Sequence, residues 1–205
     1  MTGTAEANTE LNEYIKYLKE RIFFEPLAAP HHYNLGLAYV RRGLPDAAIS
    51  EFKQALACDP QLAQAYVNLG GLYFQKGDLD QCIEANQKAL SLDPGLPMAH
   101  SNLGFAHLQR GEFMQAIAAC RHAIELAPEL LQAHNNLAVA YLQTGDQEAS
   151  IAASLRVLGI NECFPAAHYN LAVAYRIQGH LEKAREHYNQ AKALGYPADE
   201  DLESI

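Results

Sequence analysis

A block of eight residues recurs five times along this chain at a constant spacing. The segments HYNLGLAY, YVNLGGLY, HSNLGFAH, HNNLAVAY and HYNLAVAY begin at residues 32, 66, 100, 134 and 168, a period of 34 residues without an insertion. A fixed period of this length indicates that each unit is one supersecondary element that buries its apolar side against its neighbours. The chain is therefore expected to be a stack of similar units.

Each unit is predicted to be a pair of helices. Repeat positions are counted from Ala29, Ala63, Pro97, Leu131 and Pro165. Positions 4, 7, 8 and 11 hold an aromatic residue or His, then Leu, then Gly or Ala, then Tyr or His, and this spacing marks one face of a helix. A glycine at position 15 is expected to end that first helix, as at Gly43 and Gly145. A second apolar helical pattern follows, and Pro60, Pro94 and Pro128 stop it at position 32.

These typed positions resemble the tetratricopeptide repeat family, whose signature has Leu-Gly, Tyr, Ala, aromatic, Ala and Pro at the same offsets. The resemblance implies an all-α fold, a right-handed superhelical solenoid of antiparallel helix pairs. The expected boundaries are a tail and capping helix at 1–28, repeats at 29–62, 63–96, 97–130, 131–164 and 165–198, and a short acidic tail at 199–205 that starts a truncated cap.

Two parts of the array are expected to be less well packed. In the fourth repeat, Ser150 and Ser154 stand where the pattern expects Ala and an aromatic residue, which predicts a looser second helix. The cap after the fifth repeat is short, so Ile177, Leu181 and Leu194 are expected to be partly exposed.

The inner face of the first helices is the expected binding surface. Repeat positions 2, 5, 6, 9, 12 and 13 point away from the packing positions, yet they carry many apolar residues. The resemblance implies that this side lines a concave groove, and exposed apolar strips commonly mark interaction sites. The alternative is that these side chains cover one another within the array. The candidate peptide-binding residues are Asn34, Asn68, Asn102, Asn136, Asn170, Leu37, Arg41, Phe74, Phe105, Leu108, Leu142 and Arg176.

Repeat position 6 is Asn in every unit. A carboxamide both donates and accepts hydrogen bonds, which suits the backbone of an extended peptide whatever its sequence. First helices are expected to lie roughly 10 Å apart, about the span of three extended residues. This ladder resembles that of the repeat domain of O-GlcNAc transferases. The alternative is that each Asn bridges adjacent helices inside the array.

The distribution of charge limits the partners. The chain has 24 acidic and 15 basic residues and a net charge of −9, so a nucleic acid is not expected to bind. Positions 1 to 14 of the five repeats contain no Asp or Glu. The expected partner is a neutral or acidic protein segment with apolar anchors.

No catalytic chemistry is predicted. His recurs at position 4 in four repeats, but repeat-to-repeat distances of roughly 10 Å exclude one shared ion, whose ligand nitrogens lie about 2 Å away. We find no motif for a nucleophile, a phosphate or a cofactor. The four cysteines form no CxxC group and are read as reduced thiols, with Cys82 and Cys120 as small core residues. Met1–Glu10 lacks an export pattern, and the chain has no long apolar run, so the expectation is a cytoplasmic protein that does not enter a membrane.

The sequence thus favours a non-enzymatic scaffold or assembly factor that holds an extended or helical segment of another protein. Two alternatives stay open. The chain could be an accessory subunit that presents a substrate protein to a catalytic partner. It could also be a structural protein that self-assembles end to end, with the thin cap of its C-terminal repeat against the N-terminal helix of the next molecule.

Overall fold

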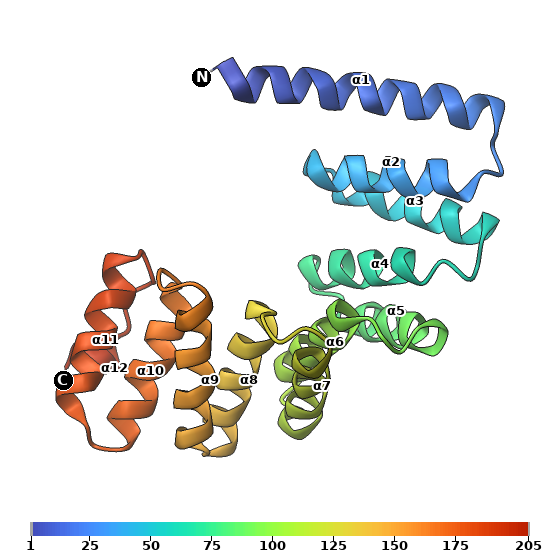
Figure 1. Ribbon diagram of the computed structural model, residues 1–205. Coiled ribbons are helices and arrows are strands. Elements are labelled where there is room, and N and C mark those ends of the chain that lie inside the picture. Colours follow the sequence, from blue (N-terminus) through green and yellow to red (C-terminus); the bar gives the residue numbers. More distant parts are fainter. Residues whose placement is uncertain (1, 205) are drawn as a thin grey trace. The chain divides into compact units, whose positions relative to one another are not determined.

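The computed structural model describes residues 2–204, with side chains from Thr9 onward. The chain separates into two compact units, an N-terminal unit of residues 1–94 and a C-terminal unit of residues 95–205. Throughout the described residues, every regular element is a helix (Figure 1). The all-α array of helix pairs expected from the sequence is confirmed.

The N-terminal unit holds one long helix followed by two helical hairpins. Its helices are α1 (Thr2–Phe24), α2 (Ala29–Arg41), α3 (Pro45–Cys58), α4 (Ala63–Gln75) and α5 (Leu79–Leu92). Helices α2 and α3 pair with each other, as do α4 and α5, while α1 packs on α2 and α4 packs on α3. The contact of α1 with α2 is a small core in which Ile15 and Leu18 meet Leu35.

The C-terminal unit continues the same construction with three hairpins. Its helices are α6 (Pro97–Gln109), α7 (Phe113–Leu126), α8 (Leu131–Thr144), α9 (Gln147–Ile160), α10 (Pro165–Ile177), α11 (Leu181–Ala193) and the short α12 (Glu200–Glu203). Each first helix packs on the second helix of its own repeat, and α8 and α10 also pack on the preceding second helix.

A left-handed glycine makes each hairpin turn. Gly43 has φ of +72°, and the four equivalent glycines have φ between +74° and +81°. After α2, the Leu44 N–H donates to the Tyr39 carbonyl, and the Gly43 N–H donates to the Val40 carbonyl. These two bonds close the end of the helix, and only glycine adopts this conformation without a steric cost. The predicted role of the position-15 glycines is confirmed.

The two helices of a hairpin approach closely at repeat position 8. A Cβ atom on Gly70 would lie 2.1 Å from Nδ2 of the buried Asn86. In the fourth repeat the position is Ala138, and the facing residue is the small Ser154. In the first three repeats, a side chain at position 8 would clash with position 24, whereas in the fifth repeat Ala172 packs beside the large Tyr188.

The second helix of the fourth repeat carries a polar defect in its buried face. Ser150 and Ser154 are both 0 % exposed, and neither hydroxyl has a hydrogen-bond partner. A buried hydroxyl without a partner loses its hydration and gains nothing in return. This local cost fits the looser packing that the sequence predicts for α9.

The end of the last hairpin carries apolar residues on its surface. Ile177, Leu181 and Leu194 are 54 %, 47 % and 37 % exposed, as expected from the short cap. Among the described helices, none combines the length and the apolar character that crossing a membrane requires.

Candidate functional site

In the N-terminal unit, three of the candidate residues come together on α2. Asn34, Leu37 and Arg41 line a cleft of about 290 Å³, which Tyr14 of α1 and the half-exposed Val40 complete. Phe74 lies on α4 and is partly buried. The cleft offers an apolar surface bordered by one carboxamide and one guanidinium group, and none of the side chains described from Thr9 onward puts a carboxylate in its lining.

In the C-terminal unit, the candidate residues divide between surface and core. Phe105 and Leu142 are partly buried. Leu108 is only 9 % exposed and belongs to a core cluster with Leu137 and Tyr141. Position 12 of α6 faces α8, which packs against it. Leu108 is therefore a contact between consecutive first helices instead of part of an open apolar floor.

Two of the Asn residues at position 6, Asn68 and Asn170, use their amide nitrogens inside the array. The Asn68 Nδ2 donates to the Tyr33 hydroxyl at 3.1 Å and to the Gln64 carbonyl at 2.9 Å. In the C-terminal unit, the Asn170 Nδ2 donates to Oδ1 of Asn135 at 3.2 Å. In both cases the acceptor side chain is position 5 of the preceding repeat, as the bridging alternative requires.

Within the described part of the chain, the same geometry leaves the carboxamide oxygens without a partner, but only that of the part-buried Asn68 is accessible, because Asn170 is 4 % exposed. Among the described residues, no hydrogen bond reaches Oδ1 of Asn68 or of Asn170. A held nitrogen fixes the orientation of the amide plane, so the oxygen has a defined direction. At Asn68 the bridging and peptide-binding roles therefore use different atoms of one side chain and are compatible.

The chain's own acidic tail lies on the inner face of the last repeat. The Tyr169 hydroxyl donates to the Asp199 carboxylate at 2.6 Å, and Arg176 pairs with Asp201 at 3.6 Å. Between these contacts, Leu202 is 2 % exposed and packs against Tyr188. Tyr169 and Arg176 occupy positions 5 and 12, and Arg176 is one of the predicted peptide-binding residues.

Electrostatics support the docked tail. The hydrogen bond from Tyr169 holds the pKa of the Asp199 carboxyl below its ordinary value. Burial, followed by the hydrogen bond to Asp199, raises the pKa of the Tyr169 phenol. The tyrosine is thus the donor and the carboxylate is the acceptor at neutral pH.

The recurring His side chains at position 4 contact backbone carbonyl groups at the junction with the preceding repeat. The His134 Nε2 contacts the Pro128 carbonyl at 2.9 Å, and His32 makes the same contact with the Pro26 carbonyl at 3.1 Å. Both carbonyls stand at the end of the preceding repeat, so these rings link the turn to the next first helix. Within the part of the chain that the structure describes, no group of three His, Cys, Asp or Glu residues could hold a metal ion.

Comparisons with known proteins agree with this architecture. Sequence models described as tetratricopeptide repeat match residues 4–63 and 33–97, 97–130, 131–162 and 165–195. Among solved structures, MamA is 27 % identical over 78 % of this chain and 94 % of its own, with a TM-score of 0.69. PilF of Pseudomonas aeruginosa is 22 % identical over 83 % and 78 %, with a TM-score of 0.73.

A third structure, YrrB, is described as a TPR protein with an unusual peptide-binding site. It is 20 % identical over 90 % of this chain and 94 % of its own, with a TM-score of 0.72. Comparison with curated proteins gave no match.

Proposed function

Since this chain belongs to the tetratricopeptide repeat family, we propose that it is a protein-interaction scaffold. Its first helices bind a neutral or acidic segment of another protein through their inner face, and its role is not catalytic. The relatives of known structure include one described by its peptide-binding site.

The docked tail is the observation that carries the proposal. Residues 199–203 are an acidic segment with one apolar anchor, which is the chemistry expected of the partner. They bind the inner face through a carboxylate on a Tyr hydroxyl, an ion pair with Arg176 and the buried Leu202. The first helices of the other repeats contain no acidic residue that would repel such a segment. Their position 12 is apolar, as at Val40 and Phe74, so an incoming segment would meet apolar side chains there in place of the cation of Arg176.

The carboxamides supply the sequence-independent part of recognition. The oxygen of Asn68 accepts a peptide N–H, while its nitrogen stays bound to Tyr33. A pre-oriented acceptor loses less conformational freedom on binding than a mobile one. Each such bond contributes roughly 0.5–1.5 kcal/mol.

A selection from random displayed 12-residue peptides on the full chain tests the proposal. Asn68→Ala should lower the affinity of inner-face peptides about two- to tenfold, the equivalent of one hydrogen bond. Tyr33→Phe is the matched control, because it removes the internal partner of Asn68 and keeps the carboxamide. It should affect binding less than Asn68→Ala does.

The two variants also separate binding from stability. If the Asn only bridges helices, both substitutions lower the melting temperature and neither changes the affinity. That result, or a selection that yields no binding peptide, would contradict the proposed use of the inner face.

Self-association is a second candidate, favoured by the exposed apolar end of the last repeat. Leu181 is 47 % exposed beside Ile177 at 54 %. Leu181→Glu should then lower the dimer fraction in sedimentation equilibrium. A wild-type chain that stays monomeric at high concentration would remove this candidate.

A further inference from the structure

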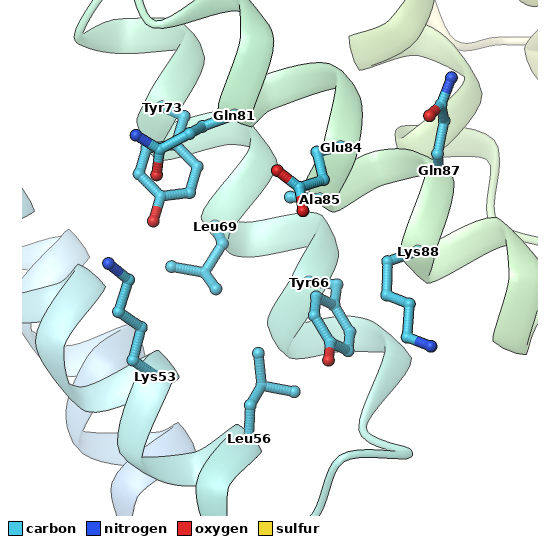
Figure 2. Close-up of a pocket in the computed structure, with 10 residues that line it drawn as sticks. All are labelled: Lys53, Leu56, Tyr66, Leu69, Tyr73, Gln81, Glu84, Ala85, Gln87 and Lys88. Carbon is cyan, nitrogen blue, oxygen red and sulfur yellow. The ribbon is translucent and has the colours of Figure 1, made fainter.

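The N-terminal unit has a second concave surface, on the side of its second helices. A cleft of about 690 Å³ is lined by α3, α4 and α5. Figure 2 shows Lys53 and Lys88 on opposite sides of Leu56, Leu69 and Tyr66. The centre of the cleft is therefore apolar, and a cation stands on each side.

The C-terminal unit repeats this cleft with the same residue types. A cleft of about 500 Å³ is lined by α7, α8 and α9. Arg121, Leu137 and Arg156 line it, and each follows its counterpart Lys53, Leu69 or Lys88 by two 34-residue periods. The two cations of each cleft come from repeat position 25 of one second helix and position 26 of the next.

The position-25 cation of each cleft, Lys53 or Arg121, lies over a Tyr ring. The Lys53 Nζ lies 5.8 Å from the centroid of the Tyr73 ring. The Arg121 guanidinium lies 6.0 Å from the Tyr141 ring, and its Nε donates to the Tyr141 hydroxyl at 3.1 Å. Contacts of this kind orient a cation without neutralising it.

The four cleft cations differ from several other basic residues in their ion pairing. The structure pairs Lys76, Arg176 and Lys192 with carboxylates. Over the described residues, no ion pair involves Lys53, Lys88, Arg121 or Arg156. Each cleft is lined by two cations and one carboxylate, Glu84 or Glu125, so its charge is opposite in sign to the chain's net charge of −9.

We propose that these two clefts are equivalent docking sites for an acidic peptide segment of a partner protein, with one aliphatic or aromatic side chain between two carboxylates. The apolar side chain fills the space over Leu69 or Leu137, and the flanking carboxylates meet the two cations. Unpaired cations around an apolar centre select such a segment by charge and by burial. This surface is separate from the inner face of the first helices.

Two charge-reversal variants of the full chain test the proposal, measured with the acidic peptides from the 12-residue display selection. Lys53→Glu with Lys88→Glu reverses the two positive charges of the N-terminal cleft. Arg121→Glu with Arg156→Glu does the same in the C-terminal cleft. Peptides with the acidic–apolar–acidic pattern should bind wild type and lose about tenfold in affinity when their cleft is reversed. Lys53→Arg with Lys88→Arg should retain binding.

The control applies the same change of charge away from both clefts. Lys16→Glu with Lys183→Glu should leave these affinities unchanged. An equal loss in the control, or a selection without enriched acidic peptides, would overturn the proposal. If the peptides lose affinity only with Asn68→Ala, the cleft proposal is overturned and the inner-face function is supported. If they lose affinity only with the cleft variants, the cleft proposal is supported and the inner-face function is contradicted.

Discussion

Replacing Ser150 by Ala should stabilise the C-terminal unit. The Ser150 hydroxyl is fully buried and has no partner, a situation that costs about 1–3 kcal/mol. Alanine is also the better helix former by about 0.5 kcal/mol. The lost oxygen forfeits a few dispersion contacts of about 0.1–0.2 kcal/mol each. The net expectation is a stabilisation of about 1–2 kcal/mol.

The repeat itself shows that alanine fits this site. Repeat position 20 is Ala48, Ala116 and Ala184 in three other units, and all three are 0 % exposed. The substitution therefore needs no repacking of the hairpin. Ser154 lies one turn further along α9 in the same state, so Ser154→Ala should act in the same direction.

Urea unfolding followed by circular dichroism measures the effect. With a slope of about 1–3 kcal/mol/M, the transition of the C-terminal unit should move up by about 0.5–1 M. Ser50→Ala is the control, because Ser50 is an exposed serine of α3, and it should change the midpoint much less. Hydrogen exchange should show slower opening of α9 in the variant.

An unchanged or lower midpoint for Ser150→Ala would refute the reasoning. It would mean that the hydroxyl is hydrogen-bonded in solution, for example to a buried water.

In wild type, the amides of the last two repeats should exchange faster than those of the second and third. Uniform protection would contradict the view of α9 as a weak point.

Three further outcomes are expected. Gly70→Ala should lower the unfolding free energy of the N-terminal unit by about 1–3 kcal/mol, because the new Cβ would lie 2.1 Å from Nδ2 of Asn86. Adding Asn86→Ser, the residue of the fourth repeat at this position, should recover much of that loss in a urea titration. Burial raises the pKa of the Cys120 thiol to about 12, so a thiol reagent at pH 8 should label the exposed Cys163 and leave Cys120 unmodified until the chain unfolds. The pKa of Asp199 is lowered mainly by its hydrogen bond to Tyr169. The ionised carboxylate therefore stabilises the docked tail at neutral pH, and this stabilisation is lost as the pH falls through the pKa of Asp199 in the folded chain. Over that pH range, proteolysis of the tail should accelerate in wild type but not in Asp199→Asn.

The clefts between second helices have a pattern in the sequence, a pair of basic residues spaced 35 residues apart, that the 34-residue period does not reveal. Lys53 and Lys88 are 35 residues apart, as are Arg121 and Arg156. A search at the 34-residue period misses them, because each pair combines two different repeat positions. Only the packing of consecutive second helices against a shared first helix brings positions 25 and 26 to one cleft.

The sequence alone determined the fold class, the hairpin unit and its turns. These features depend on local rules that recur in every repeat: one apolar face per helix, a glycine where φ must be positive, and small residues where helices approach. Local rules hold wherever the residue types recur, so the pattern was sufficient for them.

The tertiary structure decided which side chains are available for binding. Leu108 and Leu142 share the apolar character of the predicted surface, yet only Leu108 is in the core, because its neighbours on α7 and α8 cover it. Asn68 and Arg176 gained partners from a neighbouring repeat and from the tail. Exposure and hydrogen bonding depend on residues far away in the chain, so a repeating pattern cannot assign them.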